Sequence, residues 1–412
     1  MKFNEWTLGL AAGGVVSLAS AVQAEEAQHQ MSQVMTAVSS TTLSGYVDTS
    51  AIWKFGTGNA NLPGRQYDGP SKQDGFNLDV FGLTIEKPLS EEQWASGYKA
   101  DLLFGPDAFS YQALIGSTTS EFAIKQAYVA LRVPAAHGID LKAGVFDSII
   151  GYESFESYKD PNFSRSYGHG LEPKQHTGVL ASYRATDALA FSFGVANTYN
   201  PVGGDVNARP TRNGVPGSAS ESEKTYMASV SITAPESWGF LSGSAWYAGI
   251  VDGLASNTRD TTSAYAGGSL HTPIEGLSVG GAFDYRFGGP GAYSIPGATT
   301  PGGFPAGANS WAWAIAGYAS YQATEKWKFN GRLDYTEGTD GTFYDRGADG
   351  LKNLQNRLGS ATLTADYALW ANVITRAEFR WDHSMAGDKP FGDATHAYRN
   401  AASLAANVIY KF

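Results

Sequence analysis

From Thr41 to the C-terminus, apolar and polar residues alternate with a period of two, and this alternation limits the fold more than any other feature. Successive side chains of a β-strand point to opposite faces, so the pattern predicts strands with one apolar and one polar face. The segment 372–382 shows it most clearly: Val373, Thr375, Ala377, Phe379 and Trp381 alternate with Arg376, Glu378, Arg380 and Asp382. In 42–55, Trp53 lies on the apolar face and Asp48 on the polar face.

The alternation recurs in about sixteen segments separated by turn residues. They are 42–55, 76–88, 94–104, 122–133, 139–146, 176–185, 189–198, 225–234, 240–251, 261–270, 277–287, 311–322, 327–337, 357–367, 372–382 and 400–412. In 76–88, apolar residues occur on both parities, which a β-bulge would explain, although the sequence does not locate one. The connections alternate between short ones, such as 185–188, and long ones, such as 147–175. This sorting is typical of a transmembrane barrel whose termini both lie at the short-turn end.

The N-terminus has the pattern of a secretory signal peptide. Lys2 precedes the apolar stretch 8–22, and the small residues Val22 and Ala24 predict cleavage before Glu25. A transmembrane helix is the weaker alternative because the stretch is short and rich in Gly and Ala. After residue 24, no uncharged apolar run approaches the roughly 20 residues that a membrane helix needs.

A membrane-embedded chain of this kind must form a closed barrel, because lipid cannot satisfy the backbone groups of open sheet edges. The fold class that we predict is therefore all-β: a transmembrane antiparallel up-and-down barrel with short periplasmic turns and long extracellular loops. The predicted organisation is a signal peptide at 1–24, a periplasmic N-terminal tail at 25–40, and the barrel at 41–412. The tail could also form a short amphipathic helix.

Other classes of function lack support in the sequence. The chain has no Cys, which excludes disulfides and thiolate chemistry, and its seven His residues show no metal-ligand spacing. A net charge of −10 argues against nucleic acid as a partner. No Ser/His/Asp set lies in a recognisable nucleophile context. We therefore expect no enzyme, no cofactor and no metal.

Several stretches resemble the OmpL-like β-barrel porin-2 family of bacterial outer-membrane proteins. They are 42–55, 85–105, 124–157, 162–183 and the terminal VIYKF, and the resemblance is strongest over 124–183. It implies a channel-forming porin without enzymatic activity in the outer membrane of a Gram-negative bacterium. We expect passive diffusion of small hydrophilic solutes and ions through a water-filled barrel.

Two alternatives to general diffusion remain open at this point. One is a solute-selective channel for sugars or organic acids, in which the inward Tyr46, Tyr128 and Tyr318 offer sliding contacts. The other is a non-conducting structural or adhesive barrel.

The longest connection, 147–175, carries five candidate constriction residues: Tyr152, Glu153, Glu156, Asp160 and Arg165. In general porins the third extracellular loop folds inward, and 147–175 is the third by count, so by analogy we predict that it narrows the channel. Charged constrictions of this type set ion selectivity. The alternative is a loop that packs over the mouth with solvated acids.

Parity also gives candidate residues for the lumen wall. They are Lys99, Asp101, Arg132, Asp284, Arg286, Arg332, Asp334, Arg376, Glu378, Arg380 and Asp382. With the inward Lys54, Lys142, Arg184, Lys328 and Lys411 added, the wall is predominantly basic although the whole chain is acidic. A slight anion preference is one hypothesis. Cross-strand ion pairs that stiffen the wall are the other.

The closing strand carries Val408, Tyr410 and Phe412 at alternate positions. This pattern resembles the signal that the outer-membrane assembly machinery reads, although any amphipathic final strand could end in Phe. The expected partners are outer-membrane lipid, that machinery, and further copies in a homotrimer. The small residues 401–406 are one suggested trimer interface.

Overall fold

The computed structural model describes residues 34–35, 40–55, 74–111, 121–135, 137–201, 206–209, 223–254, 260–288, 310–339, 342–344, 356–392 and 396–412. The predicted signal peptide and most of the predicted tail lie outside these residues. Among the described residues, no helix has the length and apolar character needed to cross a membrane.

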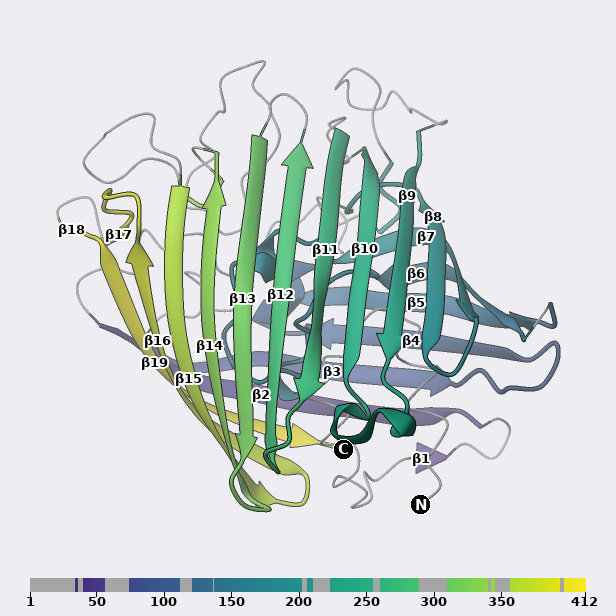
Figure 1. The fold of residues 1–412 in the computed structure, drawn as a ribbon, viewed down its shortest axis with the longest axis horizontal. Coiled ribbons are helices and arrows are strands. Elements are labelled where there is room, and N and C mark those ends of the chain that lie inside the picture. Colours follow the sequence, from purple (N-terminus) through teal and green to yellow (C-terminus); the bar gives the residue numbers. More distant parts are fainter. Residues whose placement is uncertain are drawn as a thin grey trace.

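Sixteen antiparallel strands close into one barrel (Figure 1). They are β2 (Thr42–Phe55), β3 (Gly75–Lys87), β4 (Ser96–Phe104), β5 (Phe122–Val133), β6 (Ile139–Asp147), β7 (Gln175–Arg184), β8 (Leu189–Ala196), β9 (Thr225–Thr233), β10 (Ala245–Leu254), β11 (Asp260–His271), β12 (Leu277–Gly288), β13 (Ser310–Gln322), β14 (Trp327–Gly338), β15 (Asn356–Trp370), β16 (Val373–Ser384) and β19 (Asn400–Lys411). Each pairs with its neighbours along the chain, and β19 pairs with β2, so the sheet has no open edge. The predicted all-β antiparallel barrel of about sixteen strands is confirmed, and each predicted segment overlaps one barrel strand.

Three short elements lie beside the barrel strands. β1 (Val34–Met35) pairs with the start of β2. β17 (Phe391–Gly392) and β18 (Ala397–Tyr398) pair with each other between β16 and β19.

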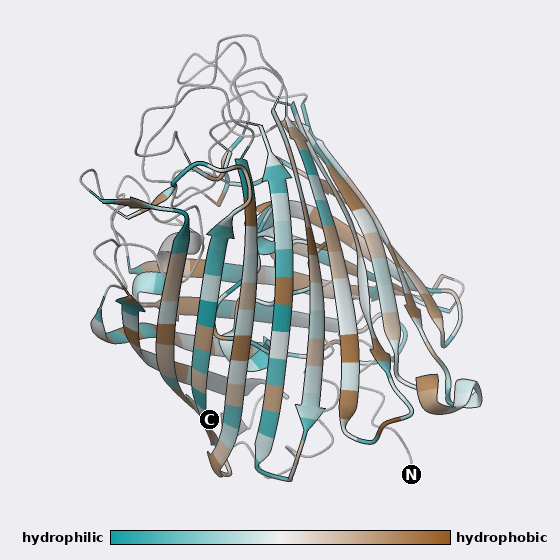
Figure 2. Ribbon diagram, turned by 60° about the vertical axis from the view of Figure 1, so that its left-hand side comes forward, coloured by the Kyte–Doolittle hydropathy of each residue, from teal (hydrophilic) through white to brown (hydrophobic). Residues whose placement is uncertain are grey.

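The strands have one apolar and one polar face, and Figure 2 shows hydrophobic and hydrophilic residues alternating along them. On β14 and β15 the outward Leu333 and Leu363 are 69% and 66% exposed. The residues directly before them in the chain, Arg332 and Thr362, are buried. An exposed apolar face and a buried polar face are the reverse of a soluble protein, and they suit a barrel with lipid outside.

The bulge that the sequence could not locate lies at Asp79 in β3. Asp48 pairs with Val80 and Thr49 with Leu78, so Asp79 is the extra residue of the bulge. The extra residue shifts the phase of the strand and turns Asp79 inward, where its Oδ1 accepts a hydrogen bond of 3.0 Å from the Ser50 hydroxyl. The irregular parity of 76–88 follows from this bulge.

Two predicted strand starts were wrong. The strand predicted at 240–251 begins only at Ala245, because residues Glu236–Leu241 form a 3₁₀-helix, η5. Gly243, inside the predicted range, has φ +80°, which a strand excludes. The strand predicted at 94–104 begins at Ser96, because Trp94 has φ +62° and lies in the preceding turn.

The barrel closes where Phe412 meets Gly45. The Gly45 N–H donates to the Phe412 carbonyl at 2.9 Å, and the Phe412 N–H donates to the Gly45 carbonyl at 3.0 Å. The Phe412 ring lies over Gly45, so a Cβ there would come within 2.6 Å of ring atom Cζ and 2.4 Å of the Gly82 carbonyl oxygen. A glycine at position 45 therefore lets the last residue pack onto the first barrel strand.

Replacing Gly45 with valine is expected to destabilise the barrel by about 1–3 kcal/mol, since the side chain must displace the Phe412 ring or the neighbouring strand. Urea unfolding of the detergent-solubilised barrel measures the loss. Gly317→Ala is the matched control, because a Cβ at Gly317 meets nothing within 4 Å. Equal stability of Gly45→Val and wild type would contradict this account of the closure.

Candidate functional site: a loop bound inside the barrel

Residues 148–174, which connect β6 to β7, lie inside the barrel, and we call them the inner loop. They contain two short 3₁₀-helices, η2 (Ser157–Lys159) and η3 (Gly168–Gly170). Most of their side chains are buried, and the contacts are to side chains on the polar, inward face of the strands. Of the five constriction candidates, Glu153, Glu156, Asp160 and Arg165 are buried and Tyr152 is half-buried.

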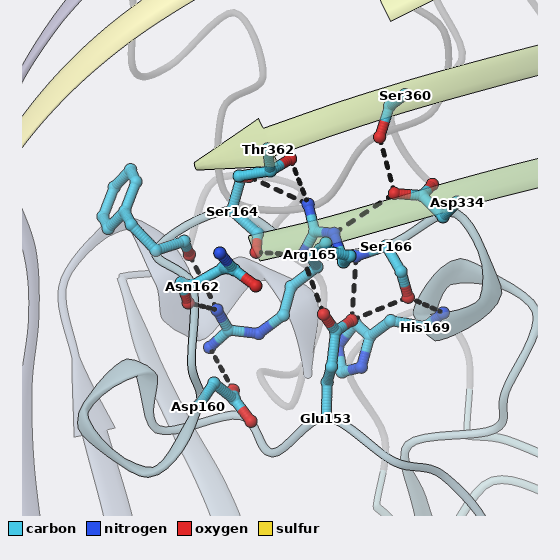
Figure 3. A network of polar contacts seen from close by, with 12 residues as sticks. Glu153, Asp160, Asn162, Ser164, Arg165, Ser166, His169, Asp334, Ser360 and Thr362 are labelled. Atoms are coloured by element: carbon cyan, nitrogen blue, oxygen red, sulfur yellow. Dashed lines mark hydrogen bonds and ion pairs between the residues drawn. The ribbon is translucent and has the colours of Figure 1, made fainter. Parts of the chain in front are cut away.

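Arg165 holds the inner loop in its folded shape (Figure 3). Its guanidinium donates to the carbonyl oxygens of Ser154 at 3.0 Å, Phe155 at 2.8 Å and Phe163 at 2.7 Å. It also lies 3.0 Å from Asp160 Oδ2. Because Arg165 bonds within its own loop, its charge is largely compensated there rather than presented to a solute.

The inner loop is fixed to β14 through Arg332. Its guanidinium lies 2.8 Å from Glu153 Oε1 and 2.7 Å from the Ser164 carbonyl oxygen, and its Nε lies 3.1 Å from Asp334 Oδ2 on the same strand. A further N–H donates to the Thr362 hydroxyl at 3.1 Å. Figure 3 shows Glu153 and Ser164 of the loop beside Asp334 and Thr362 of the wall.

Glu378 on β16 binds the loop backbone. Its two carboxylate oxygens accept the N–H groups of Phe163 at 2.6 Å and Ser164 at 2.9 Å. The Thr364 hydroxyl donates to Glu378 Oε2 at 2.8 Å and accepts from the Asn162 amide at 2.7 Å. An ionised acceptor with several donors is among the stronger hydrogen-bond arrangements in proteins.

Arg376 and Arg380 on β16 complete this attachment. Arg376 pairs with Asp366 at 2.8 Å and donates to the Asp160 carbonyl oxygen at 2.8 Å. Arg380 pairs with Asp382 at 2.9 Å and donates to the Arg165 carbonyl oxygen. Each of these arginines therefore has both a carboxylate and a loop carbonyl as partners.

The opposite wall also binds the inner loop, through a second bulge. Asp101 pairs with Gln126 and Leu102 with Ile124, so Lys125 of β5 is the extra residue and turns inward. Its ammonium pairs with Asp147 and lies 3.3 Å from Glu156 Oε1.

Aromatic packing adds to the contacts on the walls. Tyr152 stacks on Tyr318 of β13 with ring centroids 4.2 Å apart. Phe155 packs edge-on against Tyr111 at 5.0 Å. The loop thus spans the barrel from β5 to the β13–β16 wall.

The remaining wall candidates lie elsewhere on the inward face. Lys99 is 3.6 Å from Glu86 and 3.7 Å from Asp101, while Arg132 is 3.2 Å from Asp140 near the short-turn end. Asp284 lies against the loop, because a Cβ on Gly168 would be 2.3 Å from its Oδ2. Arg286 is buried on the same strand.

Sequence reasoning missed several contacts of the loop. The inward position of Lys125 was missed because it depends on the bulge, whereas simple alternation would turn this side chain outward. Asp366, Thr364, Asn162 and Ser164 carry no signal of their own, because polar residues on an inward parity are common to every strand. Only the fold brings them to the loop.

Buried charges in the inner loop have shifted pKa values. Burial raises the pKa of Asp160 to about 7, although the Arg165 guanidinium opposes the shift. Burial opposes the ionised form of Glu156 too, but the ammonium groups of Lys125 and Lys159 outweigh it and hold the pKa of that carboxyl below its usual range. Glu156 is therefore ionised at neutral pH, whereas Asp160 gains or loses its proton close to neutral pH.

The Asp160 titration predicts a pH-dependent loop. Because burial raises this pKa, the attached loop binds the proton more tightly than a released loop, whose Asp160 would have the ordinary pKa of about 4. As the pH rises through about 7, Asp160 becomes charged, and the ion pair with Arg165 only partly offsets the cost of burying that charge, so the loop is held less firmly. We expect larger current fluctuations in single-channel recordings at pH 8 than at pH 5.5. Asp160→Asn should show the low-pH behaviour at both values. An unchanged pH response in that variant would exclude Asp160 as the source.

A protein-family model described as "beta-barrel porin-2, OmpL-like" matches residues 40–412. The chain belongs to this family. This porin-2 protein is therefore an outer-membrane channel for passive diffusion, located in the bacterial outer membrane. A search among curated proteins found no match.

Solved structures share the fold of this porin-2 protein. The outer-membrane channel DcaP of Acinetobacter baumannii has a TM-score of 0.56 at 14% identity, covering 92% of this chain and 99% of that one. An anion-selective porin from Comamonas acidovorans has 0.57 at 10%, covering 90% and 99%. Salmonella typhi OmpF in complex with daunomycin has 0.55 at 12%, covering 92% and 100%. At these identities the likeness shows the fold.

Proposed function

We propose that the inner loop is the constriction of this channel, and that small hydrophilic solutes and ions diffuse through the water beside it. The observation that carries the proposal is the double attachment of the loop, to Arg332 and Glu378 on one wall and to Lys125 on the other. A loop held at both sides of a lumen narrows it. The short-turn end of the barrel would face the periplasm.

Planar-bilayer conductance and liposome swelling test this function together. Purified protein should open discrete channels, and swelling rates for neutral sugars should fall steeply as the sugar becomes larger. Folded protein that opens no channel would favour the non-conducting barrel instead. A steep preference among solutes of equal size would favour the solute-selective channel. We propose no enzymatic role, because membership of a channel family supports none.

The tyrosines suggested for solute contact differ in exposure. Tyr46 is buried against Tyr158, with ring centroids 5.0 Å apart, and Tyr318 is buried under Tyr152. Tyr128 is only half-buried. Of these three, Tyr128 is therefore the one that we propose for contact with a passing solute.

We also propose a homotrimer. OmpT of Vibrio cholerae, a solved structure of the same fold at 11% identity and a TM-score of 0.53, is described in its trimer form. In this chain, Ala365, Ala377 and Ala406 pair in sequence across β15, β16 and β19 and form a smooth outward row. Mass measurement after native solubilisation tests the oligomer, and a monomer would overturn it.

A further inference from the structure

Three inward side chains lie together on the β4–β6 wall, which Arg332, Arg376 and Arg380 do not reach. Lys99 pairs with Tyr128 across β4 and β5, and Tyr128 pairs with Gly144 on β6. Lys142 is two residues from Gly144 and shares its face of the strand. The Lys142 ammonium lies 5.0 Å from the centroid of the Tyr128 ring.

Lys142 differs from the neighbouring inward cations Lys99 and Lys125 in its partners. Lys99 is close to Glu86 and Asp101, and Lys125 pairs with Asp147 and Glu156. Within the part of the chain that the structure describes, no carboxylate lies within ion-pair distance of Lys142. An ammonium has three donors, and a ring face satisfies only part of them. The side chain is partly exposed, so an anion can reach it.

The inner loop brings a further cation to this wall. Lys159 of η2 interacts electrostatically with Lys99, as Lys99 does with Lys142. Its side chain is 32% exposed and lies 3.4 Å from Glu156, which Lys125 also contacts. The neighbouring Tyr158 has the ammonium groups of Lys159 and Lys411 at 5.7 and 5.4 Å from its ring centroid.

Among the described residues of this region, ion pairs include Lys99 and Lys159 but not Lys142. Lys99 has Glu86 and Asp101 as partners and Lys159 has Glu156, whereas the Lys142 ammonium lies over the Tyr128 ring. A cation without a carboxylate partner on the wall of a confined lumen attracts mobile anions and so raises their local concentration. The rings of Tyr128 and Tyr158 add apolar surface beside the cations.

We infer that Lys142, Lys99 and Lys159, with Tyr128 and Tyr158, bind a small organic carboxylate as it passes the inner loop. The carboxylate accepts from the ammonium groups, and its carbon chain lies against the tyrosine rings. This inference rests on the proposed function, because the anion must reach the site through the open lumen. It names organic acids as a preferred solute class of the channel.

Reversal potentials in a potassium propionate gradient test the site. The wild-type channel should pass propionate in preference to potassium, and Lys142→Gln should lower that permeability ratio about threefold with open channels retained. Lys142→Arg keeps the charge and should keep the preference. The matched control is Lys326→Gln, since Lys326 also lies over a tyrosine, 5.7 Å from the Tyr367 centroid, but in an exposed turn.

Liposome swelling with propionate and with propionamide separates charge from size. The wild type should favour propionate, and Lys142→Gln should remove that difference while propionamide uptake stays the same. If Lys142→Gln matches the wild type in both assays, the carboxylate site is wrong although the channel stands. If the folded wild type opens no channel, the proposed function itself fails.

Discussion

Arg332→Ala is expected to give the largest change in conductance of any single substitution in the barrel wall. The variant removes the cation that bridges Glu153, Asp334 and the Ser164 carbonyl, all of which are buried. Removing one partner of a buried pair leaves uncompensated charge and costs about 3–5 kcal/mol. Water that enters to solvate Glu153 should displace the inner loop from β14 and widen the passage.

Single-channel conductance and urea unfolding measure the two effects of Arg332→Ala. Conductance should rise about twofold or more, and the unfolding free energy should fall by about 3–5 kcal/mol. Adding Glu153→Gln should recover part of the unfolding free energy, because it removes the buried carboxylate charge that has lost its partner.

Arg357→Ala is the matched control for Arg332→Ala. Arg357 lies 3.0 Å from Glu337, but its side chain is 43% exposed. An exposed pair contributes about 0–1 kcal/mol, so both measurements should stay near wild type. Equal effects of the two substitutions would contradict the anchoring role of Arg332.

Glu378→Ala should give the second-largest change, by a different route. It leaves the backbone N–H groups of Phe163 and Ser164 without their acceptor inside the barrel. Each buried donor left unsatisfied costs about 1–3 kcal/mol, so the loop should detach at this point. We expect a stability loss of about 2–5 kcal/mol and a higher conductance with broader current fluctuations.

Glu378→Gln separates the hydrogen bonds from the charge. Its amide oxygen can still accept one N–H, whereas its NH₂ group faces the second donor, so the loss should be smaller than for alanine. Glu337→Ala on the outer face serves as the surface control. If Glu378→Ala conducts like the wild type, the loop does not depend on this carboxylate for its position.

The strands were predictable because each carries its own signal. The alternation in 372–382 comes from neighbouring residues, and the three residues that it assigns to the polar face, Arg376, Glu378 and Arg380, are buried in the structure. The phase of 76–88 could not be predicted, because the bulge at Asp79 depends on pairing with β2 rather than on local sequence. Lys125 escaped notice for the same reason.

The contacts of the inner loop could not be predicted from sequence. Glu153 and Arg332 are 179 residues apart, and Phe163 and Glu378 are 215 apart. Parity indicates which wall side chains face inward but not which of them the loop will cover. Arg376 and Arg380, which suggested a basic lumen, are bound to carboxylates and to loop carbonyls. Lys142 can be recognised as a candidate anion contact only when those pairs are known.

The seam between Gly45 and Phe412 also limits the order of folding. Contacts between residues far apart in the chain form slowly, because the loop they close loses much entropy before any contact compensates for it. The β2–β19 pair joins the two ends of the barrel, so it can form only after the intervening hairpins have been arranged. Until then both edges of the sheet can pair with another chain. The period before closure is therefore when this protein most needs protection from aggregation.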